Sequence, residues 1–304
     1  MTVKNISISS EHAGRRIDNF LMTILSNIPK SNIYKIIRKG EVRVNSKRIK
    51  PSFKLSEGDL VRIPPKINET KKNNLNVDSD FFENNPIIFE DDECLILNKS
   101  SGIAVHGGTK NNNGIIDYIK ASFPKYDFKL CHRLDKNTSG CLVLAKNLVF
   151  LRHFQMQLKN RNVLKKYHCI VQGKINREIT IKSKILTKTK DKSFKVIDSE
   201  DGKESITKFN LIKDYGQNSL LEGQIYTGRT HQIRLHLEHI GLNLLNDNKY
   251  GDLNFKTKFN DKSLNRMGLH ARELEFISLL GKKIRVIAKY DKKFKNLIKF
   301  ASSN

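Results

Sequence analysis

A polar stretch without any hydrophobic repeat, residues 65–85, separates two parts of this 304-residue chain that each show regular apolar patterns. Its sequence, PKINETKKNNLNVDSDFFENN, contains few aliphatic side chains, so it cannot bury enough apolar surface to form a core. We therefore predict an α+β protein with a small domain over residues 1–64, a flexible linker over residues 65–85 and a larger domain over residues 86–304.

The small domain is predicted to combine helices with a short sheet. In PKSNIYKIIRKG, Ile33, Ile36 and Ile37 recur at helical spacing, Ser31 can cap the helix and Gly40 can follow its end. The segments EVRVN and GDLVRIP then alternate apolar and polar residues, as strands do. This pattern indicates a helical hairpin followed by a small sheet.

The helix of the small domain is strongly basic. Between Lys30 and Lys50 there are eight basic residues and one acid, whereas a merely solvated surface would usually mix both signs. The basic residues predicted to lie off the apolar face of this segment are Lys35, Arg38, Lys39 and Arg43. They are candidates for contacts with a polyanion.

The charge of the whole chain supports a polyanionic partner. It has 56 lysines and arginines against 31 aspartates and glutamates, a net charge of +25 that is spread along the sequence. A coding bias toward lysine and asparagine is an alternative source of part of this excess. No apolar stretch is long enough to span a membrane and no signal-like segment follows Met1, so a cytoplasmic protein is expected.

One acidic residue of the larger domain stands beside a buried strand. The run Cys141–Ala145 is apolar throughout, as in a strand buried on both faces, and KNTSG before it has the composition of a turn. Asp135 therefore lies at the edge of a strand, next to solvent. Its carboxylate either accepts hydrogen bonds from nearby backbone N–H groups in an Asx turn or has a chemical role.

The segment TGRTHQIRLHLEHIG predicts a helix that Thr230 caps and Gly241 follows. Arg229 and Arg234 then lie at or near its N-terminus, where the helix dipole disfavours cations. This placement indicates a carboxylate or phosphate nearby, although a surface arginine without a role is the alternative.

The same segment holds His231, His236 and His239, which could suggest a metal site. Their spacings of five and three residues, without a carboxylate or cysteine close by, are poor ligand geometry, so no metal is predicted. The four cysteines show no Cys-x-x-Cys spacing and are expected to be buried thiols. The chain also lacks the glycine patterns of dinucleotide and nucleoside triphosphate sites.

Three motifs of the small domain resemble the S4-like RNA-binding module of ribosomal protein S4 and of several RNA-modifying enzymes. They are RRIDNFL, PKSNIYKIIRKGEVRVNSKRIKP and LSEGDLVRIP, and together they cover nearly all of residues 14–64. The resemblance implies that the basic face of this module contacts RNA.

The larger domain resembles the RNA pseudouridine synthase family over essentially residues 86–290. The motifs, in order, are LILNKSSGIAVHGG, CHRLDKNTSGCLVLAKN, KKYHCIVQG, TGRTHQIRLHLEHIG, DNKYGD and RMGLHARELEF. HRLDKNTSG and GRTHQIR are the most specific, and the S4-like module narrows the resemblance to the branch acting on 23S ribosomal RNA of the large subunit. The resemblance to this family implies a mixed, mainly antiparallel sheet and an isomerase that needs no cofactor and acts as a monomer.

The resemblance also implies roles for individual residues. Asp135 is the catalytic aspartate, Arg133 helps to displace the target base, and Arg234 pairs with the aspartate. Tyr167 packs on the uracil and is a candidate for the catalytic group that removes the C5 proton. Asp135 would act either as a nucleophile or as a base, and its motif leaves this choice open.

Two further positions of the GRTHQIR motif, Arg229 and His231, are assigned to RNA binding. The chain departs from the family pattern at Ser100, where proline is usual, at Leu242–Asn243, where His-Pro is usual, and in the polar loop Lys110–Asn113. None of these departures touches the positions assigned to catalysis.

Two alternative functions compete with an isomerase. A hydrolytic glycosylase would need two carboxylates or an activated water beside the sugar, and the sequence offers one well-placed acid. An RNA-binding or ribosome-assembly protein without catalysis would need only the S4-like module and the positive charge.

Overall fold

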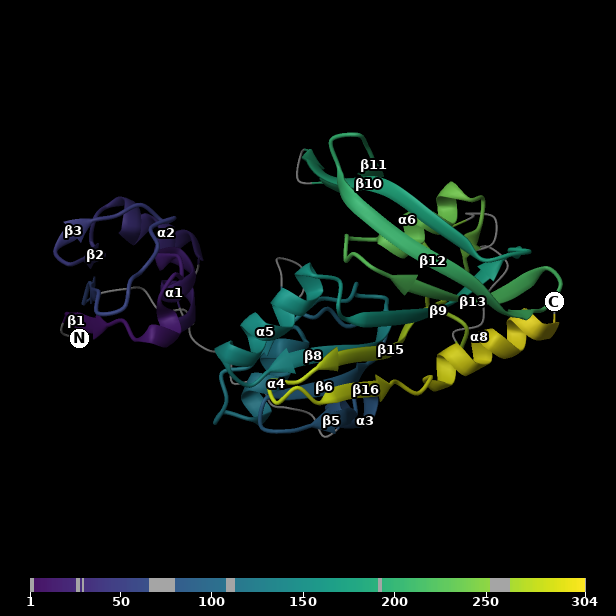
Figure 1. Ribbon diagram of the computed structural model, residues 1–304, viewed down its shortest axis with the longest axis horizontal. Coiled ribbons are helices and arrows are strands. Elements are labelled where there is room, and N and C mark those ends of the chain that lie inside the picture. The colour runs from purple at the N-terminus through teal and green to yellow at the C-terminus, as the bar shows by residue number, and fades with distance from the viewer. Residues whose placement is uncertain are drawn as a thin grey trace. The chain divides into compact units, whose positions relative to one another are not determined.

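The computed structural model describes residues 3–25, 28, 30–65, 80–107, 113–190, 193–251 and 263–303, without the side chains of residues 187–190 and 193–198. It divides into two compact units, Met1–Asn76 and Val77–Asn304, which are described separately here (Figure 1). Most of the predicted linker and most of the polar loop Lys110–Asn113 lie outside the described residues. No helix of the described ranges is long and apolar enough to cross a membrane.

The smaller unit packs two helices against a four-stranded antiparallel sheet of order β1-β4-β2-β3. Its elements are β1 (Lys4–Ser7), the short 3-10 helix η1 (Ser10–His12), α1 (Ile17–Ile24), α2 (Lys30–Arg38), β2 (Arg43–Val44), β3 (Lys47–Arg48) and β4 (Leu60–Ile63). The isoleucines Ile33, Ile36 and Ile37 are buried, as their spacing predicts. Helix α2 already includes Ser31, so the expectation that Ser31 caps it is wrong.

The larger unit is built on one extended sheet. Its elements are α3 (Asp80–Asn84), β5 (Ile87–Glu90), β6 (Cys94–Lys99), α4 (Ile115–Ser122), β7 (Lys129–Leu130), β8 (Ser139–Ala145), α5 (Leu148–Lys159), β9 (Leu164–Gln172), β10 (Ile179–Lys190), β11 (Ser193–Asp198), β12 (Lys203–Asp214), β13 (Asn218–Ile225), α6 (Gln232–His239), β14 (Asn243–Leu244), β15 (Leu269–Ile277), β16 (Lys283–Ile287) and α8 (Lys292–Ser303).

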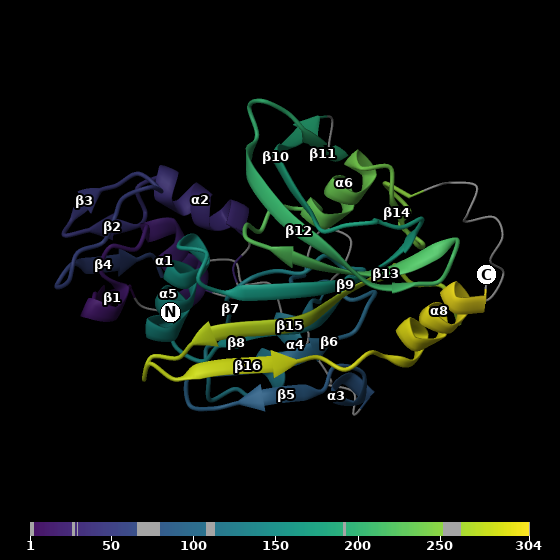
Figure 2. The same cartoon turned by 45° about the vertical axis from the view of Figure 1, so that its right-hand side comes forward.

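The strands of the larger unit follow the order β11-β10-β12-β13-β9-β15-β8-β6-β5, with β14 beside β9, β16 beside β15 and β7 beside β8. Among the described strand pairs only β8 and β15 run parallel, which confirms the predicted mixed, mainly antiparallel sheet. Figure 2 shows β9, β15 and β8 side by side in its centre. Strand β8 is buried along its whole length, as its apolar run predicts.

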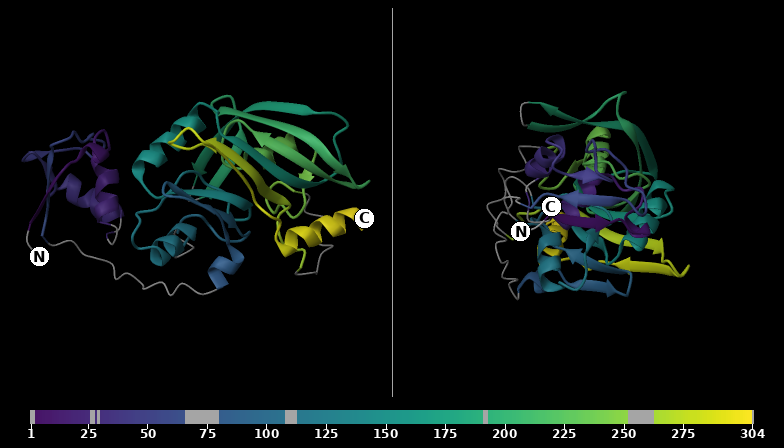
Figure 3. Two further views of the ribbon diagram at one scale, coloured as in Figure 1. Left: turned by 60° about the horizontal axis from the view of Figure 1, so that its bottom comes forward. Right: turned by 90° about the vertical axis from the view of Figure 1, so that its left-hand side faces the viewer.

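Helices cover both faces of this sheet. On one face α3, α4 and α6 contribute Phe81, Ile115, Ile119, Ile233 and Leu237 to the main core. On the other face α5 and α8 bury Phe150, Phe154, Phe294 and Leu297 against the strands, and Figure 3 shows α8 in yellow. The face under α6 carries the functional residues described below.

The start of the larger unit corrects one predicted boundary. Residues 80–84, placed in the linker from their polar composition, form helix α3, and Phe81 is buried in the main core. Phe81 stacks on Tyr118 of α4 with ring centroids 4.6 Å apart. A single buried aromatic side chain thus fixes a segment whose other residues are mostly polar.

Candidate active site

One cleft of the larger unit brings together predicted residues from three separate motifs. The predicted residues that line it are Arg133, Asp135, Tyr167, Arg229, His231 and Arg234. They come from the β7–β8 loop, from β9, and from the segment that enters and begins α6. Figure 1 shows α6 against β10 and β12.

Asp135 lies in the loop between β7 and β8, with a side chain that is 20% exposed. Its carboxylate oxygen Oδ2 is 3.6 Å from Nη1 of Arg234 and 3.8 Å from Nε2 of His231. Within the described part of the chain no backbone N–H donates to this carboxylate, whereas its backbone carbonyl accepts from Thr138 N–H at 3.1 Å. The Asx-turn alternative is therefore not what the structure contains, and the carboxylate faces Arg234 and His231 at the cleft.

The close approach of β8 and β15 places the Asp135 loop near β9. Gly140 has a φ of +109°, and a Cβ at this position would lie 2.1 Å from the carbonyl oxygen of Ala271. Ala271 in turn is the register partner of Tyr167. Only glycine permits this contact, so Gly140 helps to place Asp135 and Tyr167 on one cleft.

Arg234 has a partner that the motifs did not identify. Its Nε and Nη2 donate to the two carboxylate oxygens of Asp247, both at 2.6 Å, and the Asp247 side chain is 1% exposed. Burial alone would raise the pKa of Asp247, but the hydrogen bonds and charge of Arg234 outweigh it and the pKa is lowered. The expected pairing of Arg234 with Asp135 is thus a second, longer contact beside a bidentate pair.

Asp247 belongs to the motif DNKYGD, which indicated the family but no role for this residue. It also accepts hydrogen bonds from the backbone N–H groups of Lys249 and Tyr250, at 2.9 and 3.2 Å. The ring of Tyr250 lies under the guanidinium of Arg234, 4.8 Å from its Cζ. Asp247 and Tyr250 therefore fix the arginine that faces Asp135.

His231 occupies an unusual backbone position at the start of α6. Its φ is +57°, and it, not Thr230, is the residue that precedes the helix, so the predicted cap is wrong. Its Nδ1 is 2.9 Å from the hydroxyl of Tyr250. Burial lowers the pKa of His231 to about 4 despite the opposing charge of Asp135, so the imidazole is neutral near pH 7. A left-handed non-glycine residue of this kind is typical of functional sites.

Gln232 connects the loop before α6 to strand β12. Its Oε1 accepts from the Thr227 hydroxyl at 2.7 Å and from Arg229 N–H at 3.0 Å. Its Nε2 donates to the Ile206 carbonyl and to Thr207 Oγ1, both at 3.0 Å. All four hydrogen-bonding positions of this buried amide are filled, so α6 and its loop are locked onto β12.

His236, a second histidine of this segment, has both ring nitrogens within hydrogen-bonding distance of hydroxyl groups. His236 is buried, with Nδ1 2.8 Å from Thr207 Oγ1 and Nε2 3.0 Å from Ser205 Oγ. It joins α6 to the strands beneath it. Within the ranges that the structure describes, no group of three or more histidine, cysteine or acidic side chains could hold a metal ion.

Tyr167 lies on β9 with its side chain buried on the cleft face of the sheet, together with Cys169. Burial raises the pKa of its phenol, and the charge of Asp135 raises it further. The hydroxyl therefore stays protonated near neutral pH.

Two buried cations hold the base of the Asp135 loop from outside the cleft. The first is Lys99, whose Nζ donates to the carbonyls of Ser100 and Ile103 at 2.8 Å and of Lys136 at 3.1 Å. Ser100, where the family usually has proline, donates its N–H and its hydroxyl to Asn85 Oδ1. The departure from the family pattern is therefore used in a local hydrogen-bond network.

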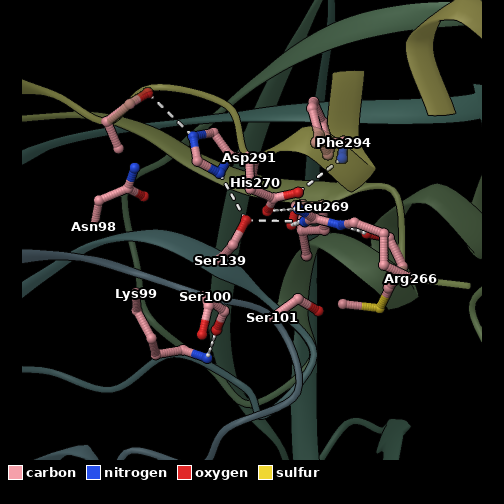
Figure 4. Close-up of polar contacts among 12 residues, drawn as sticks. Asn98, Lys99, Ser100, Ser101, Ser139, Arg266, Leu269, His270, Asp291 and Phe294 are labelled. Atoms are coloured by element: carbon pink, nitrogen blue, oxygen red, sulfur yellow. Dashed lines mark hydrogen bonds and ion pairs between the residues drawn. The ribbon is translucent and has the colours of Figure 1, made fainter. Parts of the chain in front are cut away.

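The second buried cation is Arg266, whose Nη2 donates to Ser139 Oγ at 2.9 Å and whose Nη1 pairs with Asp291 (Figure 4). His270 Nε2 must donate to the Ala288 carbonyl, so its Nδ1 accepts the Ser139 hydroxyl proton at 2.7 Å. This chain of hydrogen bonds fixes Ser139, the first residue of β8. The motif RMGLHARELEF gave no role for either Arg266 or His270.

The basic residues of the smaller unit lie where their spacing predicts. Lys35, Arg38 and Lys39 are exposed on or just after α2, and Lys39 Nζ is 3.6 Å from a carboxylate oxygen of Glu41. Arg43 is half-buried on β2, with Nε donating to the Gly40 carbonyl at 3.4 Å. These residues belong to a separate unit from the cleft.

Comparisons with known proteins identify the families of both units. The RNA pseudouridylate synthase family matches residues 93–239 and the S4 domain matches residues 15–61. The chain is 43% identical over 282 residues to ribosomal large subunit pseudouridine synthase C of Haemophilus influenzae, covering 90% of this chain and 87% of that protein. It is 42% identical over 308 residues to the protein of the same name from Buchnera aphidicola subsp. Schizaphis graminum, covering 98% and 97%.

A solved structure shares the fold of the larger unit. Human RNA Pseudouridylate Synthase Domain Containing 4 superposes with a TM-score of 0.57 at 24% identity, over 71% of this chain and 92% of the human one. The chain belongs to the RNA pseudouridine synthase family and carries an S4 domain. The two resemblances predicted from the motifs are confirmed.

Proposed function

We propose that this protein isomerises specific uridines of large-subunit ribosomal RNA to pseudouridine, with Asp135 as the catalytic carboxylate. The observation that carries the proposal is the accessible Asp135 carboxylate, 3.6 Å from Arg234 and in one cleft with Tyr167. The names of relatives that match nine-tenths or more of the chain support the choice of substrate.

The reaction breaks the N-glycosidic bond, turns the uracil, rejoins it through C5 and removes the C5 proton. Asp135 begins the cleavage as a nucleophile on the sugar or as a base, and its accessible position suits either route. Arg234, held by Asp247, faces this carboxylate and orients it. Arg133 is exposed at the cleft, where it can help to keep the target base out of its stack.

Two neutral groups are available for the later proton transfer. Burial raises the pKa of the Tyr167 phenol, so this hydroxyl is protonated near pH 7 and can donate a proton or pass one on. His231 is uncharged and its Nε2 faces Asp135. Neither group needs a cofactor.

The glycosylase alternative finds little support in the cleft. Among the lining residues that the structure describes, Asp135 is the only acid. Asp247, the next carboxylate, is 1% exposed and has both oxygens bound to Arg234, so it is not placed to activate water.

The test is to incubate the protein with unmodified large-subunit ribosomal RNA and to map carbodiimide-reactive pseudouridines by primer extension. We expect new reactive positions at defined uridines with the wild-type protein and none with Asp135→Asn. Tight RNA binding without any new pseudouridine would support the non-catalytic RNA-binding alternative instead. The same map identifies the uridines that are used.

A further inference from the structure

Two buried lysines border the site, and only one of them has its hydrogen bonds satisfied. Lys99 is fully buried but donates to three carbonyl oxygens within 3.1 Å. Lys165 is 7% exposed, and its one hydrogen bond within the described part of the chain runs to the Thr227 carbonyl at 3.5 Å, the limit for such a bond. An ammonium group has three donors, so Lys165 has capacity for further acceptors.

The charges around Lys165 make this position unfavourable in the free protein. Among the described residues it forms no ion pair with a carboxylate, and the charged group that acts on it is the cation Arg229. Burial, with a further contribution from Arg229, lowers the pKa of Lys165 to about 8. A buried cation without a counter-ion is costly and is seldom retained without a partner.

Lys165 is also next to the cleft. It lies on β9 two residues before Tyr167, so both side chains point to the same face of the strand. Thr227, whose carbonyl it contacts, leads directly into Gly228 and Arg229, which line the cleft. A Cβ added at Gly228 would meet nothing within 4 Å, so the space above this loop is open.

We propose that Lys165 and Arg229 together form a phosphate-binding site at the rim of the cleft, which holds one backbone phosphate of the RNA beside the target nucleotide. A phosphodiester supplies oxygen acceptors for both donors, and its one negative charge reduces the repulsion between the two positive charges. Arg229 is exposed and anchored by its Nε to the Glu204 carbonyl at 3.0 Å. The proposal rests on the proposed function insofar as the ligand is RNA.

The strand offers a matched control. Lys166, the next residue, points to the opposite face and pairs with Glu222 at 3.1 Å. Lys165→Met and Lys166→Met therefore remove the same charge from neighbouring positions of β9. Both are made in full-length protein carrying Asp135→Asn, so that binding is measured without turnover.

Affinity is measured at several salt concentrations for a ribosomal RNA hairpin that contains a mapped uridine. Lys165→Met should weaken binding about tenfold, the value of one charged hydrogen bond. It should also lower the slope of log affinity against log salt by about 0.7. Lys166→Met should leave the slope unchanged, and Lys165→Arg should retain most of it.

A second arm distinguishes a backbone phosphate from free phosphate. Hairpins with a single neutral methylphosphonate linkage are compared across the positions flanking the uridine. One linkage should weaken binding to the Asp135→Asn protein but have no further effect on the Lys165→Met variant. Inorganic phosphate at millimolar concentration should not abolish this difference.

The stability of the Lys165→Met variant distinguishes a role of Lys165 in binding from a role in folding. Lys165→Met should unfold at the same or higher denaturant concentration, because a buried unpaired charge is lost. A destabilised variant with an unchanged salt slope, or the absence of any linkage-specific effect, would overturn the proposal. Failure of the proposed function would instead appear as absence of pseudouridine with wild-type protein, whatever Lys165 contributes to binding.

Discussion

The cations on α2 of the smaller unit and Arg234 of the larger unit present positive charge in opposite ways. On the smaller unit Lys35 and Arg38 are exposed on α2 and remain hydrated. In the larger unit the Arg234 side chain is 10% exposed and is fixed by two hydrogen bonds to Asp247, with Asp135 beyond. Exposed cations add affinity that salt screens, whereas a buried bidentate arginine sets the position of another group. The difference predicts that the units contribute separately to binding and to chemistry.

The largest expected effect is that of Asp135→Asn, which should reduce pseudouridine formation below detection. RNA affinity should stay near wild type, because this carboxylate faces Arg234 and His231 at the cleft and not a phosphate. Stability should change by less than about 1 kcal/mol, since the carboxylate caps no backbone group. Carbodiimide mapping, filter binding and chemical denaturation check the three statements.

Asp127→Asn is the control for this substitution, because Asp127 is an exposed acid that pairs with Lys129 away from the cleft. Measurable turnover by Asp135→Asn would remove Asp135 from the chemistry. Loss of RNA affinity in the same variant would place the carboxylate in binding instead.

Tyr167→Phe should lower the single-turnover rate constant for pseudouridine formation about 10²–10⁴-fold, the range for loss of a proton-transfer group. Phenylalanine retains the buried ring and its stacking surface, so the melting temperature and RNA affinity should stay near wild type. The measurement is single-turnover kinetics with excess enzyme. Wild-type yield would return Tyr167 to ordinary core packing and leave the proton to His231, Asp135 or solvent.

Asp247→Asn tests whether the chemistry depends on the support of Arg234. The substitution keeps the shape of the side chain but leaves a largely buried guanidinium without its bidentate partner, which should cost about 3 kcal/mol of unfolding free energy. Displacement of Arg234 should also lower the rate constant by up to about a hundredfold. Urea denaturation and kcat are the measurements, with RNA affinity as the quantity that should move least.

An unchanged kcat in Asp247→Asn would show that Arg234 keeps its position without Asp247. In that case the contact of Arg234 with the Tyr250 ring would be the sufficient support. The variant Tyr250→Leu would then be the decisive one.

The sequence predicts most of the fold because periodicity reports which side of an element is buried. The spacing of Ile33, Ile36 and Ile37 and the apolar run of β8 both correspond to buried faces. The GRTHQIR motif likewise brought Arg229 and Arg234 to the start of α6, although the helix begins later than its apparent cap suggested. Local patterns of this kind do not depend on distant segments.

Pairings between distant polar groups could not be predicted in the same way. Asp247 is 13 positions from Arg234, and Thr227 is 62 positions from Lys165. Nothing in either local pattern indicates which buried donor meets which acceptor. The proposed phosphate site and the support of Arg234 therefore emerge only from the folded chain.

The smallest expected effect is on the smaller unit, where Lys35→Gln, Arg38→Gln and Lys39→Gln are combined in one variant. If all three contact phosphates, the slope of log affinity against log salt should fall by about 2, from about 0.7 for each contact. These contacts position the RNA without specifying the uridine, so kcat at saturating RNA and the map of modified sites should not change.

Deletion of residues 1–64 should lower the slope at least as much. Glu41→Gln, which removes the carboxylate partner of Lys39, is the matched control and should leave the slope unchanged or raise it slightly. An unaltered slope in both the triple variant and the deletion would mean that the smaller unit binds something other than this RNA.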